Sequence, residues 1–109
     1  MSPLEDAIWL TESSRSDGKR VFGPKGEIGP LQITYGCWQD ATEHNPDIGG
    51  RYADCHNLDY SLAIFRSYMD RYARGMTDVQ KARIWYGGPK GCHKNYTLGY
   101  RAVKILQGS

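Results

Sequence analysis

Apolar residues recur at helical spacing along the chain, most clearly between residues 58 and 72. In this segment they follow one another at intervals of four, three, four and three residues and form one stripe: Leu58, Leu62, Phe65, Met69 and Tyr72. Gly75 is a natural stop for the helix. The pattern predicts an amphipathic helix over residues 58–72 that packs one face against a core.

Start and stop signals predict four more helices. The first spans residues 2 to about 12, and Ser2, Pro3 and Glu5 occupy the N-cap, N1 and N3 positions of a capping box. The other three are predicted over residues 35–43, 77–87 and 97–108.

A glycine-rich segment separates the first two predicted helices. Val21-Phe22 and Glu27-Ile28 flank the turn sequence Gly-Pro-Lys-Gly, which predicts a short hairpin. The expected fold class is therefore mainly α (α+β), with several helices and one small β-hairpin after the first helix. A chain of 109 residues has room for one domain over residues 1–109.

Composition narrows the possible partners. A net charge of +2 is far below that of a dedicated nucleic-acid binder, so no nucleic acid is expected as a partner. There is no apolar run long enough to span a bilayer. No signal peptide opens the chain, which indicates a cytosolic protein or a mature domain with a replaced start. The 8 tyrosines and 3 tryptophans suit either a core or a sugar-binding cleft.

Metal-ligand patterns do not stand out. The histidines at positions 44, 56 and 93 are scattered, and the three cysteines match neither a zinc site nor a CxxC redox motif. No metal or cofactor is expected. Three cysteines allow at most one internal disulfide.

Glu12 is the residue whose position suggests chemistry. A helix C-terminus carries partial negative charge, and shielding by the hairpin would remove water, so both effects raise the pKa of this carboxyl. A carboxyl that stays protonated near neutral pH can protonate the leaving oxygen of a glycoside. The alternative is a solvated glutamate at a frayed helix end.

The motifs around Glu12 resemble those of the lysozyme superfamily. Residues 11–14 (TESS) and 26–33 (GEIGPLQI) are similar to the Glu-Ser … Gly-x-x-Gly-x-x-Gln-Ile signature of soluble lytic transglycosylases and invertebrate-type lysozymes. The second half resembles the invertebrate-type branch in three blocks: YMDRYA at 68–73, ARIWYGGPKG at 82–91 and TLGY at 97–100. The blocks occur in order and cover nearly the whole chain.

The resemblance implies a two-lobed helical domain with Glu12 in the groove between the lobes as the general acid. The implied activity is muramidase cleavage of peptidoglycan glycan strands, by hydrolysis or by a lytic transglycosylase route. The resemblance further implies a secreted or periplasmic glycosidase that degrades bacterial cell walls and acts as an antimicrobial. Whether it has an inhibitor or carrier protein is unknown. The alternatives are a catalytically decayed homologue that binds glycan or a protein partner, and an isopeptidase.

A second catalytic carboxylate is harder to assign, because the hairpin aspartate of the invertebrate-type branch is absent. Asp17 is the leading candidate, although Asp-Gly is also a common turn pair. Glu27 is the second candidate, and an enzyme in which Glu12 works alone is the third possibility.

The resemblance also implies substrate-binding residues: Gln32, Gly29, Trp85, Tyr86, Gly87 and Gly88. Gln32 is expected to face the cleft, and Gly29 to let backbone approach sugar or the catalytic helix. Gly87 and Gly88 are expected to shape the loop of the opposite wall.

Two departures from the family bear on binding and on disulfides. The family's His-Asn pair is Trp85-Tyr86 here, whose rings are expected to stack on sugar or to narrow the cleft. Most cysteines of the branch are missing. Cys55 and Cys92 are a candidate pair, and Cys37 is expected to be a buried thiol.

Overall fold

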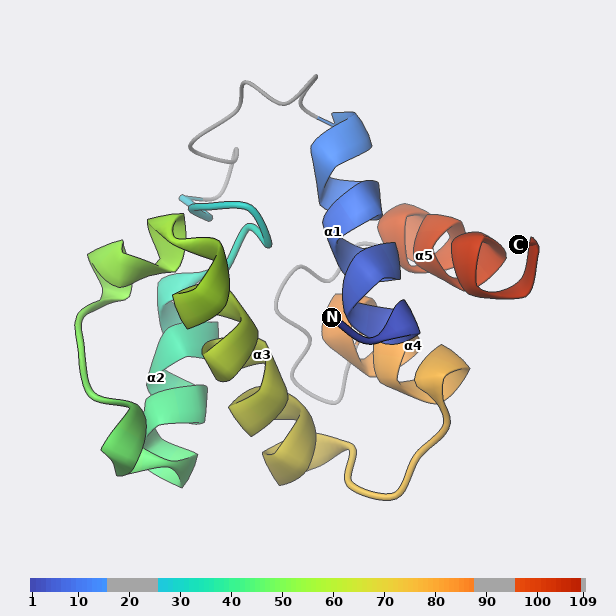
Figure 1. Cartoon of the computed structure of the whole chain (residues 1–109). Coiled ribbons are helices and arrows are strands. Elements are labelled where there is room, and N and C mark those ends of the chain that lie inside the picture. The colour runs from blue at the N-terminus through green and yellow to red at the C-terminus, as the bar shows by residue number, and fades with distance from the viewer. Residues whose placement is uncertain (16–25, 88–95, 109) are drawn as a thin grey trace.

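The computed structural model describes residues 1–15, 26–87 and 96–108, and this part of the chain is mainly helical (Figure 1). The elements are α1 (Pro3–Arg15), α2 (Tyr35–His44), the 3-10 helices η1 (Pro46–Ile48) and η2 (Tyr52–His56), α3 (Leu58–Tyr72), α4 (Asp78–Gly87) and α5 (Tyr96–Gly108). All five predicted helices are present. Within the described ranges, no helix has the length and apolar character needed to cross a membrane.

The predicted hairpin is not confirmed. The described residues contain no strand, and their β-type contact is an isolated antiparallel bridge between Ile28 and Ile33, with N···O distances of 3.1 and 2.9 Å. A tight turn over residues 29–32 closes this bridge, because Gly29 adopts a positive φ of 79° directly after Ile28. The expected first strand at 21–22 lies outside the described residues.

Side-chain caps fix where the helices begin. The capping box of α1 is confirmed: the Ser2 amide donates to Glu5 Oε1 at 3.0 Å, and the Glu5 amide donates to Ser2 Oγ at 3.1 Å. Thr34 caps α2 by accepting from the Cys37 amide, and Asn57 caps α3 by accepting from an amide in its first turn.

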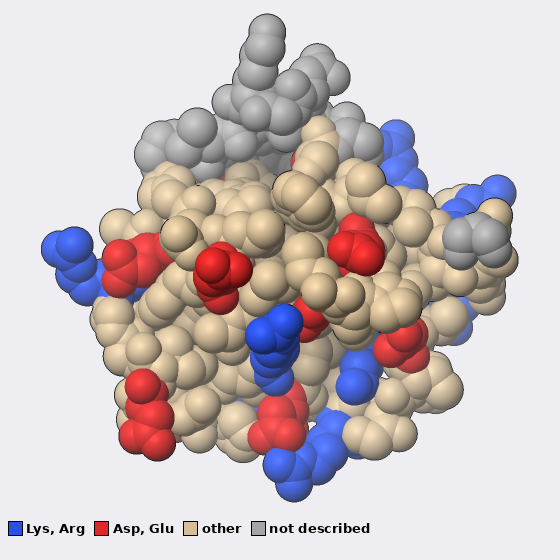
Figure 2. Space-filling model, viewed as in Figure 1, with Lys and Arg blue, Asp and Glu red and all other residues tan. Residues whose placement is uncertain are grey.

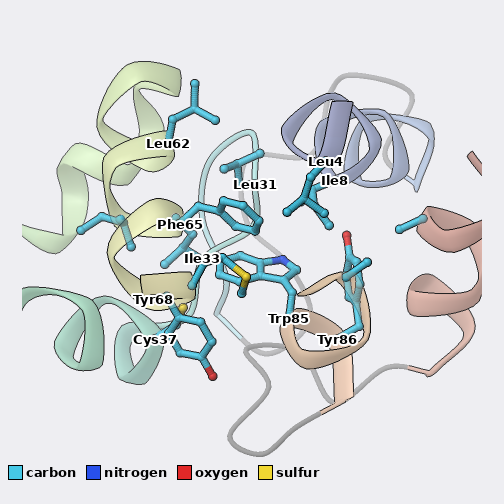
Figure 3. Packing of buried hydrophobic residues seen from close by; sticks show 14 of the residues in the cluster. Leu4, Ile8, Leu31, Ile33, Cys37, Leu62, Phe65, Tyr68, Trp85 and Tyr86 are labelled. Atoms are coloured by element: carbon cyan, nitrogen blue, oxygen red, sulfur yellow. The ribbon is translucent and has the colours of Figure 1, made fainter. Parts of the chain in front are cut away.

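The helices form two groups that meet at an aromatic core. Figure 1 shows α2 beside α3 on one side and α1, α4 and α5 together on the other. Where the groups meet, Trp85 of α4 packs against Phe65 and Tyr68 of α3, with ring centroids 4.7 and 5.5 Å apart (Figure 3). Burial of these rings joins the two groups.

An ion pair reinforces the contact between the two groups. Arg66 of α3 donates to both carboxylate oxygens of Glu5, with Nε–Oε2 at 2.7 Å. Hydrogen bonding by Arg66 lowers the pKa of Glu5 below its ordinary value, although burial opposes the shift. The same glutamate therefore caps α1 and ties it to α3.

The cysteines differ from the sequence expectation. Cys55 is a free and fully buried thiol, so the candidate pair of Cys55 with Cys92 is wrong. Burial raises the pKa of the Cys55 thiol to about 12, which keeps it protonated and unreactive. Cys37, expected as a thiol, is disulfide-bonded.

Candidate active site

Glu12 lies in the C-terminal part of α1 and is buried, with only 2% of its surface exposed. Leu4, Ile8 and Glu12 are spaced four residues apart, so they share one face of the helix, and all three are buried. The face of α1 that packs against the core therefore also directs the Glu12 carboxyl inward. A solvated glutamate at a frayed end is excluded.

Tyr86 holds the Glu12 carboxyl. Its hydroxyl donates to Glu12 Oε2 at 2.7 Å, and both side chains are buried. Figure 3 shows the Tyr86 hydroxyl pointing away from α4. Burial favours the neutral form of a carboxyl and a donated hydrogen bond favours the charged form, so Glu12 is subject to opposing influences.

The predicted stacking of Trp85 on sugar is wrong. The ring is fully buried between Phe65 and Tyr68, and no face of it reaches the surface (Figure 3). Tyr86 is also fully buried, so it does not offer an exposed ring to a glycan. Its hydroxyl instead contacts the Glu12 carboxyl.

Gly29 is required for a different contact from the one expected. A Cβ at this position would lie 1.8 Å from the carbonyl oxygen of Cys55, so the absence of a side chain lets the turn approach the backbone of η2. In this structure, the close neighbour is neither α1 nor an open surface. The glycine therefore packs the turn against η2.

Gln32 combines burial with an unusual backbone. It has a positive φ of 52°, rare for a non-glycine residue. Its Nε2 donates to the Gly29 carbonyl at 2.8 Å, while its buried Oε1 has no hydrogen-bond partner among the described residues. A strained residue with an unsatisfied polar atom is typical of functional sites.

Of the remaining candidate site residues, the structure describes some and not others. Asp17 and Gly88 lie outside the described residues. Gly87 ends α4, where a Cβ would lie 2.8 Å from the exposed Tyr96 ring, so the missing side chain lets this ring of α5 lie close to the end of α4. Glu27 is buried. The described residues contain no group of three potential ligands that could hold a metal ion.

A pocket between α4 and α5 is a feature that the sequence did not reveal. It has a volume of about 480 Å³, and Tyr86 forms part of its wall. Because the Tyr86 hydroxyl contacts Glu12, one tyrosine side chain links the pocket to the carboxyl.

The chain matches no protein-family model, and no curated protein is significantly similar to it.

Proposed function

We propose that this chain is a muramidase that cleaves the glycan strands of bacterial peptidoglycan, with Glu12 as the general acid. The observation that carries the proposal is a carboxyl with 2% exposure at the end of α1, held by a tyrosine hydroxyl at 2.7 Å. Burying an unpaired carboxylate is costly and favours its neutral form, and a carboxyl that can hold a proton suits glycoside cleavage. The motifs that resemble lysozyme-like enzymes centre on this same residue.

In the proposed reaction, Glu12 gives its proton to the glycosidic oxygen as the bond between N-acetylmuramic acid and N-acetylglucosamine breaks. The resulting carboxylate then takes a proton back from the attacking hydroxyl. When that hydroxyl belongs to water, the product has a free reducing end. When it belongs to the muramic acid sugar itself, a 1,6-anhydro ring forms. Tyr86 orients the carboxyl throughout.

The number of carboxylates separates the two routes. Asp17 or Glu27 would be the second group of a hydrolase, and Glu27 is buried on the segment that leads to Gln32. Asp17→Asn and Glu27→Gln each test one candidate. Loss of turnover in one of these variants, together with reducing products from the native chain, supports the two-carboxylate route. Near-full activity in both variants, with products lighter by one water, supports Glu12 acting alone.

The decisive experiment is lysis of purified peptidoglycan in a zymogram by the native chain and by Glu12→Gln, which keeps the size of the side chain and removes the acid. Glu43→Gln is the matched control, because Glu43 is an exposed glutamate in a surface pair with Arg71. We expect Glu12→Gln to abolish lysis and Glu43→Gln to retain it. Lysis by Glu12→Gln would overturn the proposal.

Two other outcomes identify the alternatives. Binding to peptidoglycan without lysis at any pH identifies a decayed, binding-only homologue. Release of peptide amines without new sugar ends identifies an isopeptidase.

A further inference from the structure

The pocket between α4 and α5 has a distinct chemical character. Aromatic and apolar side chains line it, chiefly Tyr86, Tyr96, Tyr100 and Val103. Its volume of about 480 Å³ is in the range of sites that bind small molecules or short peptide segments. Tyr96 and Tyr100 are 79% and 63% exposed, so their rings are accessible at this surface.

Two cations also line the pocket. Arg83 comes from α4 and Lys104 from α5, and no acidic residue lies among the described residues of the lining. The Lys104 ammonium lies 5.4 Å from the centroid of the Tyr100 ring, which places the charge over an aromatic face. Elsewhere, on the face in Figure 2, acidic and basic side chains are interspersed. The pocket thus offers positive charge beside apolar rings.

Tyr86 connects this pocket to the acid. Its ring lines the cavity while its hydroxyl donates to Glu12. Because this buried ring forms part of the wall, one tyrosine side chain separates a ligand in the cavity from the proposed proton donor. On the polymer that Glu12 is proposed to cleave, the groups nearest the scissile bond are the sugars and the short peptide attached to muramic acid.

The geometry points to this pocket as the binding site for the acidic stem peptide of peptidoglycan. This inference rests on the proposed function and names the part of the substrate that the pocket takes. Free carboxylates of the peptide pair with Arg83 and Lys104, and its aliphatic side chains pack on Tyr96 and Tyr100. The pocket would thereby distinguish peptidoglycan from uncharged chitin-type glycans.

The test measures binding to the full chain carrying Glu12→Gln, so that neither probe is consumed. One probe is the disaccharide–peptide unit of peptidoglycan, and the other is the same disaccharide after its peptide has been removed. We expect Lys104→Gln or Arg83→Gln to weaken binding of the peptide-bearing probe by about tenfold and to leave the other unchanged. Added salt should also weaken binding of the peptide-bearing probe.

Arg101→Gln is the matched control, because Arg101 is an exposed arginine of α5 that does not line the pocket. Circular dichroism and thermal unfolding verify that each variant is folded. Equal weakening of both probes by Lys104→Gln would show that the pocket holds sugar, and would overturn the inference. Unchanged binding of both probes, or no binding of the peptide-bearing probe, would overturn it as well. Failure of the muramidase proposal is recognised separately, by lysis that persists in Glu12→Gln.

Discussion

Tyr86→Phe tests whether the hydrogen bond to Glu12 serves catalysis. The substitution removes one hydroxyl and keeps the ring, which is fully buried and packs against α5, where Gly99 leaves room for it. The lost bond, 2.7 Å long, joins two buried side chains. Removing one partner of such a bond costs about 1–3 kcal/mol.

Catalysis and stability should respond differently. If the bond orients the carboxyl in the transition state, about 1.5–2 kcal/mol corresponds to roughly a 10- to 30-fold fall in kcat. KM should change little, because the hydroxyl touches the acid and not the glycan. Any loss of folding free energy should lower Tm by roughly 4–8 °C per kcal/mol. The assay is turnover of soluble glycan fragments together with thermal unfolding.

Tyr68→Phe provides the matched control. The Tyr68 hydroxyl is also buried, but it has no hydrogen-bond partner among the described residues, and burial raises its pKa. Removing it should leave activity unchanged and stability equal or higher. The reasoning would be refuted if Tyr86→Phe kept full kcat while losing stability, because the bond would then be structural only. A rise in KM alone would place Tyr86 against the glycan.

Three further predictions concern Gly29, the Glu5–Arg66 pair and Trp85. Gly29→Ala should lower the free energy of unfolding by more than about 2 kcal/mol in chemical denaturation, because the new Cβ meets the backbone of η2. Gly26→Ala is the control: its Cβ meets open space, so its positive φ alone should cost about 1–2 kcal/mol. Equal losses in the two variants would contradict the close approach to η2. Arg66 lowers the pKa of Glu5, so their pair stabilises the fold fully above pH 4.5, and this contribution is lost as the pH falls through the lowered pKa. Arg66→Gln should therefore lower Tm at pH 7, and by progressively less as the pH falls below 4.5. Trp85→Phe should lower stability by roughly 1–3 kcal/mol through the cavity it leaves, with no change in affinity for a chitooligosaccharide; weaker binding by the folded variant would restore its role in stacking.

The helices could be predicted from the sequence because apolar spacing and helix capping depend only on residues close together in the chain. The stripe of α3 and the capping box of Ser2 and Glu5 depend on residues within a few positions of one another, and the structure reproduces both. The predicted hairpin is not confirmed: among the described residues the bridge joins Ile28 to Ile33, and the expected first strand at 21–22 lies outside them.

The site was only partly predictable, because its contacts join residues that lie far apart in the sequence. The burial of Glu12 fits the inward face of α1, but its partner lies 74 residues away in the sequence. Trp85 and Tyr86 are neighbours that point roughly 100° apart on a helix. Both are buried because α3 covers α4 on one side while α1 and α5 cover it on another. The sequence shows that Trp85 and Tyr86 are adjacent, but it does not show that other helices cover α4 on two sides.

The position of Trp85 makes it an intrinsic fluorescence probe of the contact between the two helix groups. The three tryptophans lie in different surroundings: Trp9 is 38% exposed, Trp38 is half-buried with its indole N–H bonded to the Tyr60 hydroxyl, and Trp85 is fully enclosed between the two helix groups. Its emission therefore depends on whether the groups remain in contact. With the other two indoles replaced by phenylalanine, fluorescence would follow the separation of the two halves of the molecule directly.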